Sequence, residues 1–279
     1  MLVRSVFPLE SGDYEVALSL SEGRRLNYTW TVTDEGNAPN PRVIAMIPES
    51  TILPANTLRI YLEFDQPMAR GHVRDFIQFI DANGFVDRHA FLNLRTELWN
   101  DQQTRVSLLF DPGRLKKDVG PNKEIGTPLV AGERYSIQVL KGMKSAAGLP
   151  LTESSVFEFD AVKSERTNID PSRWALGIPH SGSISPLSLG FNRTMDSENI
   201  KHTLWVRSAD NQIIEGEVTQ SHQRWMFTPE SIWKSGNYEI VIHHSMEDIA
   251  GNRVSHGFDS INGSKRLGQD KYVLPFLVH

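Results

Sequence analysis

Two stretches of the chain repeat the same order of apolar and turn residues, and this repeat limits the fold more than any other feature. LRIYLEFDQPM (58–68) matches PLSLGFNRTM (186–195) at a constant offset of 127 residues. YSIQVLKGMKSAAGLPL (135–151) matches YEIVIHHSMEDIAGNRV (238–254) at an offset of 103 residues. Such a repeat predicts two similar domains, and a chain of 279 residues has the length for two domains of ordinary size.

Two shorter landmarks lie between and after these segments. LLFDP (108–112) matches WMFTP (225–229) at an offset of 117, and Phe159-Asp160 matches Phe258-Asp259 at an offset of 99. The falling offsets give the first copy about 10 extra residues before the 108–112 segment, about 14 after it, and about four before the last landmark. We expect these insertions in surface loops, where backbone polar groups stay hydrated.

The matched segments have the period of β-strands. In LRIYLEF, apolar residues alternate with Arg59, Tyr61 and Glu63, a pattern that buries one face of a sheet and exposes the other to water. Turn signals such as DPG and AGN separate the segments, and the best helical candidates span only about two turns. Short strands at this spacing predict Greek-key β-sandwiches.

The landmarks together resemble bacterial Ig-like domains of surface-layer and other cell-surface proteins. The resemblance is carried by LEFDQPM and LGFNRTM, by FTP, by SGNYEIVI, and by EDIAGN followed by GFD, and it covers residues 42–162 and 173–262. It implies two tandem Ig-like Greek-key β-sandwiches that serve as spacers, adhesion modules or enzyme appendages. The family supplies no catalytic residues to carry over.

The predicted organisation has four parts. Residues 1–40 carry an N-terminal β-hairpin extension, formed by 13–33, which we expect to add to the first sandwich or to cover its edge. Residues 41–162 form the first sandwich, the polar segment 163–172 is a linker, and 173–279 form the second sandwich. The second sandwich includes the apolar C-terminal strand KYVLPFLV (271–278), which must be buried against some partner.

Composition excludes several classes of function. A net charge of −5 lacks the excess of Lys and Arg that binding to a nucleic-acid backbone requires. The absence of cysteine excludes disulfides, thiolate zinc sites and thiol catalysis. No apolar run has the length of a membrane span. The chain also begins without a secretory leader. We expect a protein exported to the periplasm or cell surface whose leader is absent here, with a cytoplasmic location as the alternative.

The segment SMEDIAGN (245–252) admits two interpretations. Glu247 and Asp248 could contribute oxygen ligands to a calcium ion, although one pair of carboxylates falls far short of the usual coordination. Alternatively, Asp248 caps its own turn while Gly251 or Asn252 takes positive φ. The sequence favours the turn, because Ser145 replaces Asp248 in the other copy.

The candidate binding residues lie in the insertions of the first copy. Trp99 has no counterpart in the second copy, so it could form an exposed aromatic platform or instead pack on its own sheet. The segment 112–132 is either a recognition loop for an acidic partner or a solvated loop. Its candidate residues for such contact are Arg114, Lys116, Lys117 and Lys123.

The sequence therefore predicts a non-catalytic structural or binding protein that presents loops to an unknown protein or polysaccharide. It contains no recognisable hydrolase, nucleotide-binding or metalloprotease motif, and we expect no catalytic residue, metal ligand or cofactor. Two alternatives stay open. An accessory carbohydrate-binding module would show an aromatic platform around Trp99, and an enzyme would show a cleft between the sandwiches with converging ionisable residues.

Overall fold

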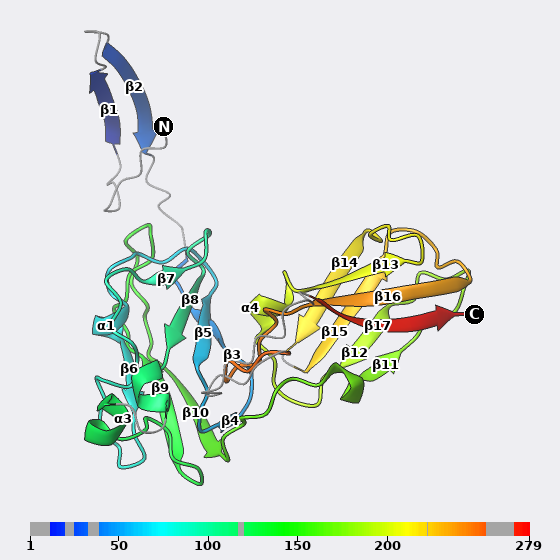
Figure 1. The fold of residues 1–279 in the computed structure, drawn as a ribbon. Coiled ribbons are helices and arrows are strands. Elements are labelled where there is room, and N and C mark those ends of the chain that lie inside the picture. Colours follow the sequence, from blue (N-terminus) through cyan, green and yellow to red (C-terminus); the bar gives the residue numbers. More distant parts are fainter. Residues whose placement is uncertain (1–11, 20–24, 33–38, 117–119, 222, 255–270) are drawn as a thin grey trace.

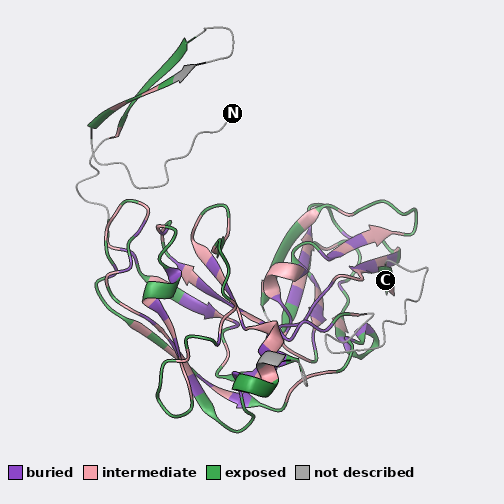
Figure 2. Ribbon diagram, turned by 60° about the vertical axis from the view of Figure 1, so that its left-hand side comes forward, coloured by how far each residue is buried: buried purple, intermediate pink, exposed green. Residues whose placement is uncertain are grey.

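The fold is all-β, as the sequence predicts. The computed structural model describes residues 12–19, 25–32, 39–116, 120–221, 223–254 and 271–279. Within these residues, the strands form two sandwiches and a separate hairpin (Figure 1). Buried residues lie along the facing sides of the sheets, and exposed residues lie in the turns and in the hairpin (Figure 2).

The N-terminal hairpin consists of β1 (Gly12–Ser19) and β2 (Arg25–Val32), paired with Gly12 opposite Val32. Its strands are present as predicted, but the expected docking on the first sandwich is wrong. Neither strand belongs to a sandwich sheet, β2 is almost entirely exposed, and the hairpin projects away from the first sandwich (Figure 1). The physical reason is that β1 and β2 pair along their whole length, and Tyr14 stacks on Trp30 across the pair. The hairpin therefore needs no sheet edge to satisfy the backbone groups between its strands.

The first sandwich packs two four-stranded sheets with the orders β3-β5-β8-β7 and β4-β10-β9-β6. All pairs are antiparallel except β4 with β10, which are parallel. The strands are β3 (Val43–Ile47), β4 (Ile52–Pro54), β5 (Arg59–Phe64), β6 (Ile77–Ile80), β7 (Leu98–Trp99), β8 (Arg105–Leu109), β9 (Arg134–Val139) and β10 (Ser155–Val162). Three short helices lie in the connections: α1 (Val73–Phe76), α2 (Pro112–Leu115) and α3 (Gly120–Ile125).

The second sandwich has sheets with the orders β11-β12-β15-β14 and β13-β16-β17, all antiparallel. The strands are β11 (Ala175–Gly177), β12 (Leu187–Gly190), β13 (Leu204–Ser208), β14 (Gly216–Ser221), β15 (Arg224–Pro229), β16 (Gly236–His243) and β17 (Lys271–Val278). The 3-10 turn η1 (Pro171–Arg173) precedes β11, and α4 (Ser197–Ile200) precedes β13. The C-terminal apolar segment is thus β17, which pairs with β16 of its own sandwich and buries Phe276 and Val278 in that core.

Both sandwiches have the strand order of an immunoglobulin domain. One sheet has the order A-B-E-D and the other contains C-F-G. In the first sandwich these are β3-β5-β8-β7 and β6-β9-β10, and in the second they are β11-β12-β15-β14 and β13-β16-β17. The order arises because each strand presents alternate apolar residues to one shared core, while the turns between strands fix which strands are neighbours.

Matched residues occupy equivalent places in the two cores. Phe64 ends β5 and Phe191 follows β12, and both are buried. Tyr135 of β9 stacks on Phe159 at 5.9 Å, and Tyr238 of β16 stacks on Phe276 of β17 at 5.6 Å. Phe258, the predicted match of Phe159, lies outside the described residues. Phe276 of β17 lies opposite Tyr238 as Phe159 lies opposite Tyr135.

The two large insertions of the first copy form the structures that distinguish its rim. The first lengthens the connection between β6 and β7, which has 17 residues (81–97), whereas the equivalent connection between β13 and β14 has seven (209–215). The second insertion forms α2 and α3, whose Arg114 and Leu115 are buried. The segment 112–132, predicted to be either a recognition loop or a solvated loop, thus contains two short helices and two buried side chains in its described residues.

Candidate functional site

The two sandwiches meet at a cluster of charged and polar side chains, here called the junction. Arg59, Tyr61 and Arg105 come from the first sandwich, and Asp196, Glu198 and Glu247 come from the second. In this cluster, Arg59 Nη1 lies 2.9 Å from Asp196 Oδ2, and Arg59 Nη2 lies 2.5 Å from Glu247 Oε2. Arg105 pairs with both Glu63 of its own sheet and Glu198 of α4. The outer face of β5 is thus an interface, and the prediction that this face is fully solvated is wrong.

Tyr61 is the most buried group on this outer face, with 5% of its surface exposed. Its hydroxyl donates to Asp196 Oδ1 at 2.7 Å. Asp196 Oδ1 also accepts from the backbone N–H groups of Glu198 and Asn199, so the same carboxylate caps α4. Burial raises the pKa of Tyr61, which keeps the phenol protonated and able to donate.

Burial and charge act against each other at Asp196. Burial raises the pKa of the Asp196 carboxyl, while Arg59 and the Tyr61 hydroxyl act in the opposite direction. At Arg59, burial by itself favours the neutral form, but Asp196 and Glu247 outweigh it and raise the pKa of the guanidinium. Arg59 therefore stays cationic, and removing either carboxylate leaves a poorly hydrated positive charge.

The SMEDIAGN segment is a turn, as the sequence favours. Asp248 Oδ1 accepts from the N–H groups of Ala250 and Asn252, at 3.0 and 2.9 Å. Asp248 Oδ2 accepts from the Asn252 amide and from Arg193 Nη1, at 2.9 and 3.1 Å. Gly251 has a φ of 78°, a conformation that glycine adopts without strain. Since a carboxylate has about four acceptor positions, these contacts fill those of Asp248 and leave none for a calcium ion.

The first copy builds the same turn from different side chains. Ser145 Oγ accepts from the N–H of Leu149 at 3.2 Å, and Gly148 has a φ of 83°. Ser145 bridges to Met68, as Asp248 bridges to Met195. Ser145 therefore caps its turn as Asp248 does, and only Asp248 also reaches an arginine.

The residue after Asp248 inserts into the other sandwich. Ile249 is 2% exposed and packs in the core of the first sandwich, and its carbonyl accepts from the N–H of Leu58 at 2.7 Å. The predicted linker is also held from both sides, because the carbonyl of Glu165 accepts from the side-chain amides of Asn56 and Asn252, at 2.5 and 2.9 Å. Apolar packing and hydrogen bonds thus join the sandwiches directly.

A small cavity of about 210 Å³ adjoins this contact. Lys163, Glu165, Arg193 and Asp248 are the ionisable groups in its wall. Arg193 donates to Thr167 and to the carbonyl of Asn168 as well as to Asp248, and Glu165 accepts from Thr167. Ionisable residues therefore converge between the sandwiches, but Glu165, Arg193 and Asp248 are engaged in structural hydrogen bonds.

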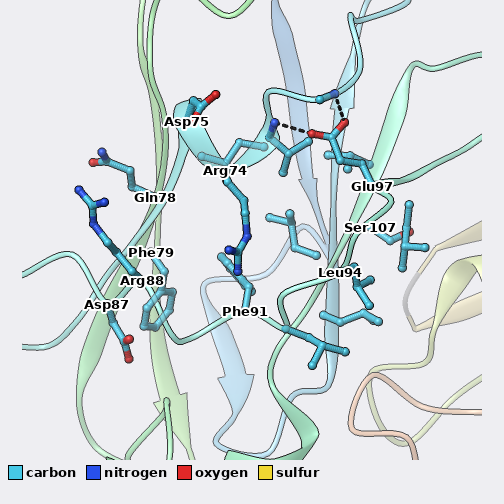
Figure 3. A pocket seen from close by; sticks show the side chains of 18 of the residues that line it. Arg74, Asp75, Gln78, Phe79, Asp87, Arg88, Phe91, Leu94, Glu97 and Ser107 are labelled. Carbon is cyan, nitrogen blue, oxygen red and sulfur yellow. Dashed lines mark hydrogen bonds between the residues drawn. The ribbon is translucent and has the colours of Figure 1, made fainter. Parts of the chain in front are cut away.

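A larger cavity of about 610 Å³, here called the edge cavity, opens at the rim of the first sandwich. It lies between α1 and β6 on one side and β7 and β8 on the other, beneath the long β6–β7 connection (Figure 3). β6 and β7 are the outermost strands of their sheets, so the cavity occupies the gap where the two sheets separate. Its size is typical of small-molecule sites.

Two carboxylates hold the β6–β7 connection in place over the edge cavity. Glu97 accepts from the N–H groups of Gly71 and Val73 and from Trp99 Nε1, each at 2.7 Å (Figure 3 shows the first two). Asp87 accepts from Arg114 Nη1 at 2.7 Å, and its own N–H donates to the carbonyl of Phe79. These contacts fix both ends of the connection.

The five predicted binding residues do not form one surface. Trp99 is half-buried, packs on Phe64 at 5.7 Å and donates to Glu97, so it forms no exposed platform. Arg114 is 4% exposed and is engaged by Asp87 and by the carbonyl of Gly126. Lys116 and Lys123 are exposed, and Lys117 lies outside the described residues. The predictions for Trp99 and Arg114 as contact residues are wrong, because each is needed to hold the rim of the edge cavity.

Comparison with known proteins yields likeness of fold only. No family model matches the chain, and no curated protein matches it. Among solved structures, a fragment of native α2-macroglobulin from Escherichia coli spanning domains MG0-NIE-MG1 is similar over 86% of this chain and 71% of that one, with 9% identity and a TM-score of 0.29. Titin domains Z1Z2 in complex with telethonin are similar over 87% of this chain and 98% of that one, with 12% identity and a TM-score of 0.24.

The N-terminal four Ig domains of Dscam1 isoform 6.44 are similar over 80% of this chain and 53% of that one, with 12% identity and a TM-score of 0.22. At these scores, the strand order described above carries the assignment of an Ig-like fold. Among the described residues, no helix has the length and apolar character needed to cross a membrane.

Proposed function

We propose that the chain is a non-catalytic module in which two Ig-like domains, 41–162 and 173–279, hold their outer surfaces in a fixed relative position. The observation that carries this proposal is the junction together with Ile249. A flexible tether between domains would need none of these contacts: the charged cluster, the inserted Ile249 side chain and the linker that hydrogen-bonds to both sandwiches. By default, domains within one chain are expected to move relative to each other unless their interface is extensive.

Three features of the residues between the sandwiches favour a structural role over catalysis. Asp248 and Asp196 are almost completely buried, and each accepts hydrogen bonds from its own turn or helix. Arg59 and Arg193 face these carboxylates. A catalytic acid or base needs to reach a substrate proton, whereas these groups are directed at one another.

The proposal includes export to a bacterial surface or the periplasm, which is what the resemblance to cell-surface Ig-like domains implies. The partner is then a protein or polysaccharide at that location. Fractionation of cells that express the natural gene tests this part: the protein should be found outside the cytoplasm, and a purely cytoplasmic pool would contradict it.

Förster transfer between the sandwiches tests the fixed geometry. The chain has no cysteine, so Asn83→Cys and Asp210→Cys in exposed turns allow specific labelling of each sandwich. We expect a narrow distance distribution in the parent protein and a broad one when Arg59→Ala and Ile249→Ala are combined. Equally broad distributions in both proteins would refute the fixed arrangement.

Carbohydrate binding remains a second candidate, now through the hairpin and not through Trp99. Tyr14 stacks on Trp30 at 5.8 Å, and Tyr28 opposite Val16 adds to the same face. Tyr28 and Trp30 are 56% and 40% exposed, and exposed aromatic rings can stack on sugars. Retention on insoluble polysaccharide that is lost in Trp30→Ala would support this candidate, and equal behaviour of the two proteins would eliminate it.

A further inference from the structure

The acidic residues that line the edge cavity have partners within the protein, whereas the basic ones are available. Six charged residues line it, three of them acidic. Two of these acids, Asp87 and Glu97, are occupied by Arg114 and by backbone and indole N–H groups, as described above. The third, Asp75, lies 3.7 Å from His72 and is directed away from the guanidinium of Arg74 (Figure 3).

The three arginines that line the edge cavity are Arg74, Arg88 and Arg95. All three are exposed, and within the described part of the chain none of their guanidinium groups forms a hydrogen bond or an ion pair. Arg74 extends into the cavity toward Phe91 (Figure 3). A guanidinium group presents a planar set of donors that matches a carboxylate in two-point contact. The cavity therefore has three cationic groups available for an anionic ligand.

The rest of the lining is mostly apolar. Val86, Leu94 and Leu98 expose 42%, 38% and 39% of their surfaces, and Phe79 packs edge-on against Phe91 beneath them. A site for sugars needs several neutral hydrogen-bonding side chains for the hydroxyl groups, whereas only Gln78 and Ser107 are of that kind among the lining residues. This lining fits aliphatic side chains better than a sugar ring.

The backbone at this rim favours an extended ligand. β7 ends its sheet, so one side of this strand has no neighbouring strand among the described residues, and such an edge can accept an added peptide strand. We propose that the edge cavity binds an extended acidic peptide, whose carboxylates pair with Arg74, Arg88 and Arg95 and whose apolar side chains enter the cavity.

This inference goes beyond the proposed two-domain geometry and does not depend on it. The junction is formed by residues of β5, by Arg105 of β8 and by the second sandwich, whereas the edge cavity is lined by other residues, all of the first sandwich. Peptide binding without a fixed junction, or a fixed junction without peptide binding, would therefore separate the two proposals.

Fluorescence anisotropy with the whole chain tests the inference. The probe is a short labelled peptide of alternating glutamate and leucine, and its uncharged match has glutamine in place of glutamate. We expect the acidic peptide alone to bind, and we expect each of Arg74→Gln, Arg88→Gln and Arg95→Gln to weaken it by about fivefold. The triple variant should lose about 100-fold if the three contributions add.

The matched control removes the same charge elsewhere. Arg173→Gln, Arg224→Gln and Lys234→Gln together alter exposed residues of the second sandwich and should leave peptide affinity unchanged. Circular dichroism should show that both triple variants melt as the parent does, because all six side chains are exposed. A cavity variant that binds as tightly as the control would overturn the inference.

A second ligand separates the peptide from an acidic polysaccharide. Oligogalacturonate presents carboxylates on sugar rings, and we expect it to compete poorly with the peptide. If oligogalacturonate bound in an arginine-dependent way while the acidic peptide did not bind, the site would belong to an acidic glycan and the peptide proposal would be wrong. If neither ligand bound, the proposal would also be wrong.

Discussion

Replacing Ile249 by alanine should weaken the first sandwich, although Ile249 belongs to a loop of the second. Ile249 lies beside Ile52, Pro54 and Val162 of the first sandwich, and it is 2% exposed. Truncating a buried isoleucine to alanine costs about 2–5 kcal/mol. The side chain borders a cavity of about 210 Å³ that water can enter, so we expect the lower end of the range, about 2 kcal/mol. This cost corresponds to about a 30-fold change in the opening equilibrium.

Hydrogen exchange measured by mass spectrometry locates this effect. In Ile249→Ala, amides of β4, β5 and β10 should exchange faster, because the core of the first sandwich loses an apolar contact and the backbone carbonyl that accepts from the N–H of Leu58 is held less firmly. The matched control is Ile240→Ala, which removes the same atoms from a residue that is fully buried in the second core. The control should accelerate exchange in β13, β16 and β17 and leave β5 unchanged.

Two results would refute the reasoning. Unchanged exchange in β5 of Ile249→Ala would mean that the insertion does not stabilise the first sandwich. Identical exchange patterns in the two variants would mean that the sandwiches unfold as one unit, so that the position of a truncation within the pair does not matter.

Three further predictions concern the turn, the junction and the hairpin. In urea unfolding, Asp248→Ala should cost about 3–5 kcal/mol because it leaves Arg193 without its buried partner, whereas Asp248→Ser should cost less because a serine caps the equivalent turn; equal costs would contradict this. The raised pKa of Asp196 means that the folded state holds this proton more tightly than the unfolded state does, so from about pH 4 up to the folded pKa the parent should lose stability with rising pH relative to Asp196→Asn. If thermal melts gave parallel pH profiles for the parent and Asp196→Asn, Asp196 would not contribute to the pH dependence of stability. Deleting residues 1–38 should shift the melting temperature by less than about 2 °C, and a larger fall would show that the hairpin contacts a sandwich.

The architecture was predictable because it follows from local patterns. Alternating apolar residues determine which face of each strand is buried, and the turn residues determine where each strand ends. These two patterns are enough to place Tyr135 and Tyr238 in equivalent strands. They placed the C-terminal strand in the second sandwich but did not show that its Phe276 lies opposite Tyr238, because the match used for this position, Phe258-Asp259, depended on two residues alone. The longer apolar run that contains Phe276 was the better signal.

The junction could not be predicted from periodicity, because an alternating strand shows which face is polar and not what lies against it. Comparison of the two copies did, however, indicate that the outer face of β5 is unusual. Arg59, Tyr61 and Glu63 correspond to Pro186, Ser188 and Gly190 at the offset of 127 residues. Large polar side chains on one copy alone indicate a face with a partner of its own.

The structure gives Trp99 and Arg114 roles other than the contacts predicted for them. Trp99 and Arg114 look available in the sequence because each lies in a segment without a counterpart. In the structure both have hydrogen-bond partners: Trp99 donates to Glu97, two residues before it, and Arg114 donates to Asp87, which lies 27 residues before it. The exposed arginines 74, 88 and 95 were not singled out, because separate arginines without a motif acquire meaning only when a cavity brings them together.

The difference between Ile249 and Ala146 gives the pair of sandwiches a direction. Both residues occupy the same position in the same kind of turn, but only the isoleucine is long enough to enter a neighbouring core. A chain with the two sandwiches in reverse order would present Ala146 to its neighbour and would lack this contact. An array built from such units would therefore have two different ends. Each sandwich could insert a side chain into the core of the sandwich before it only if its own turn carried the larger residue.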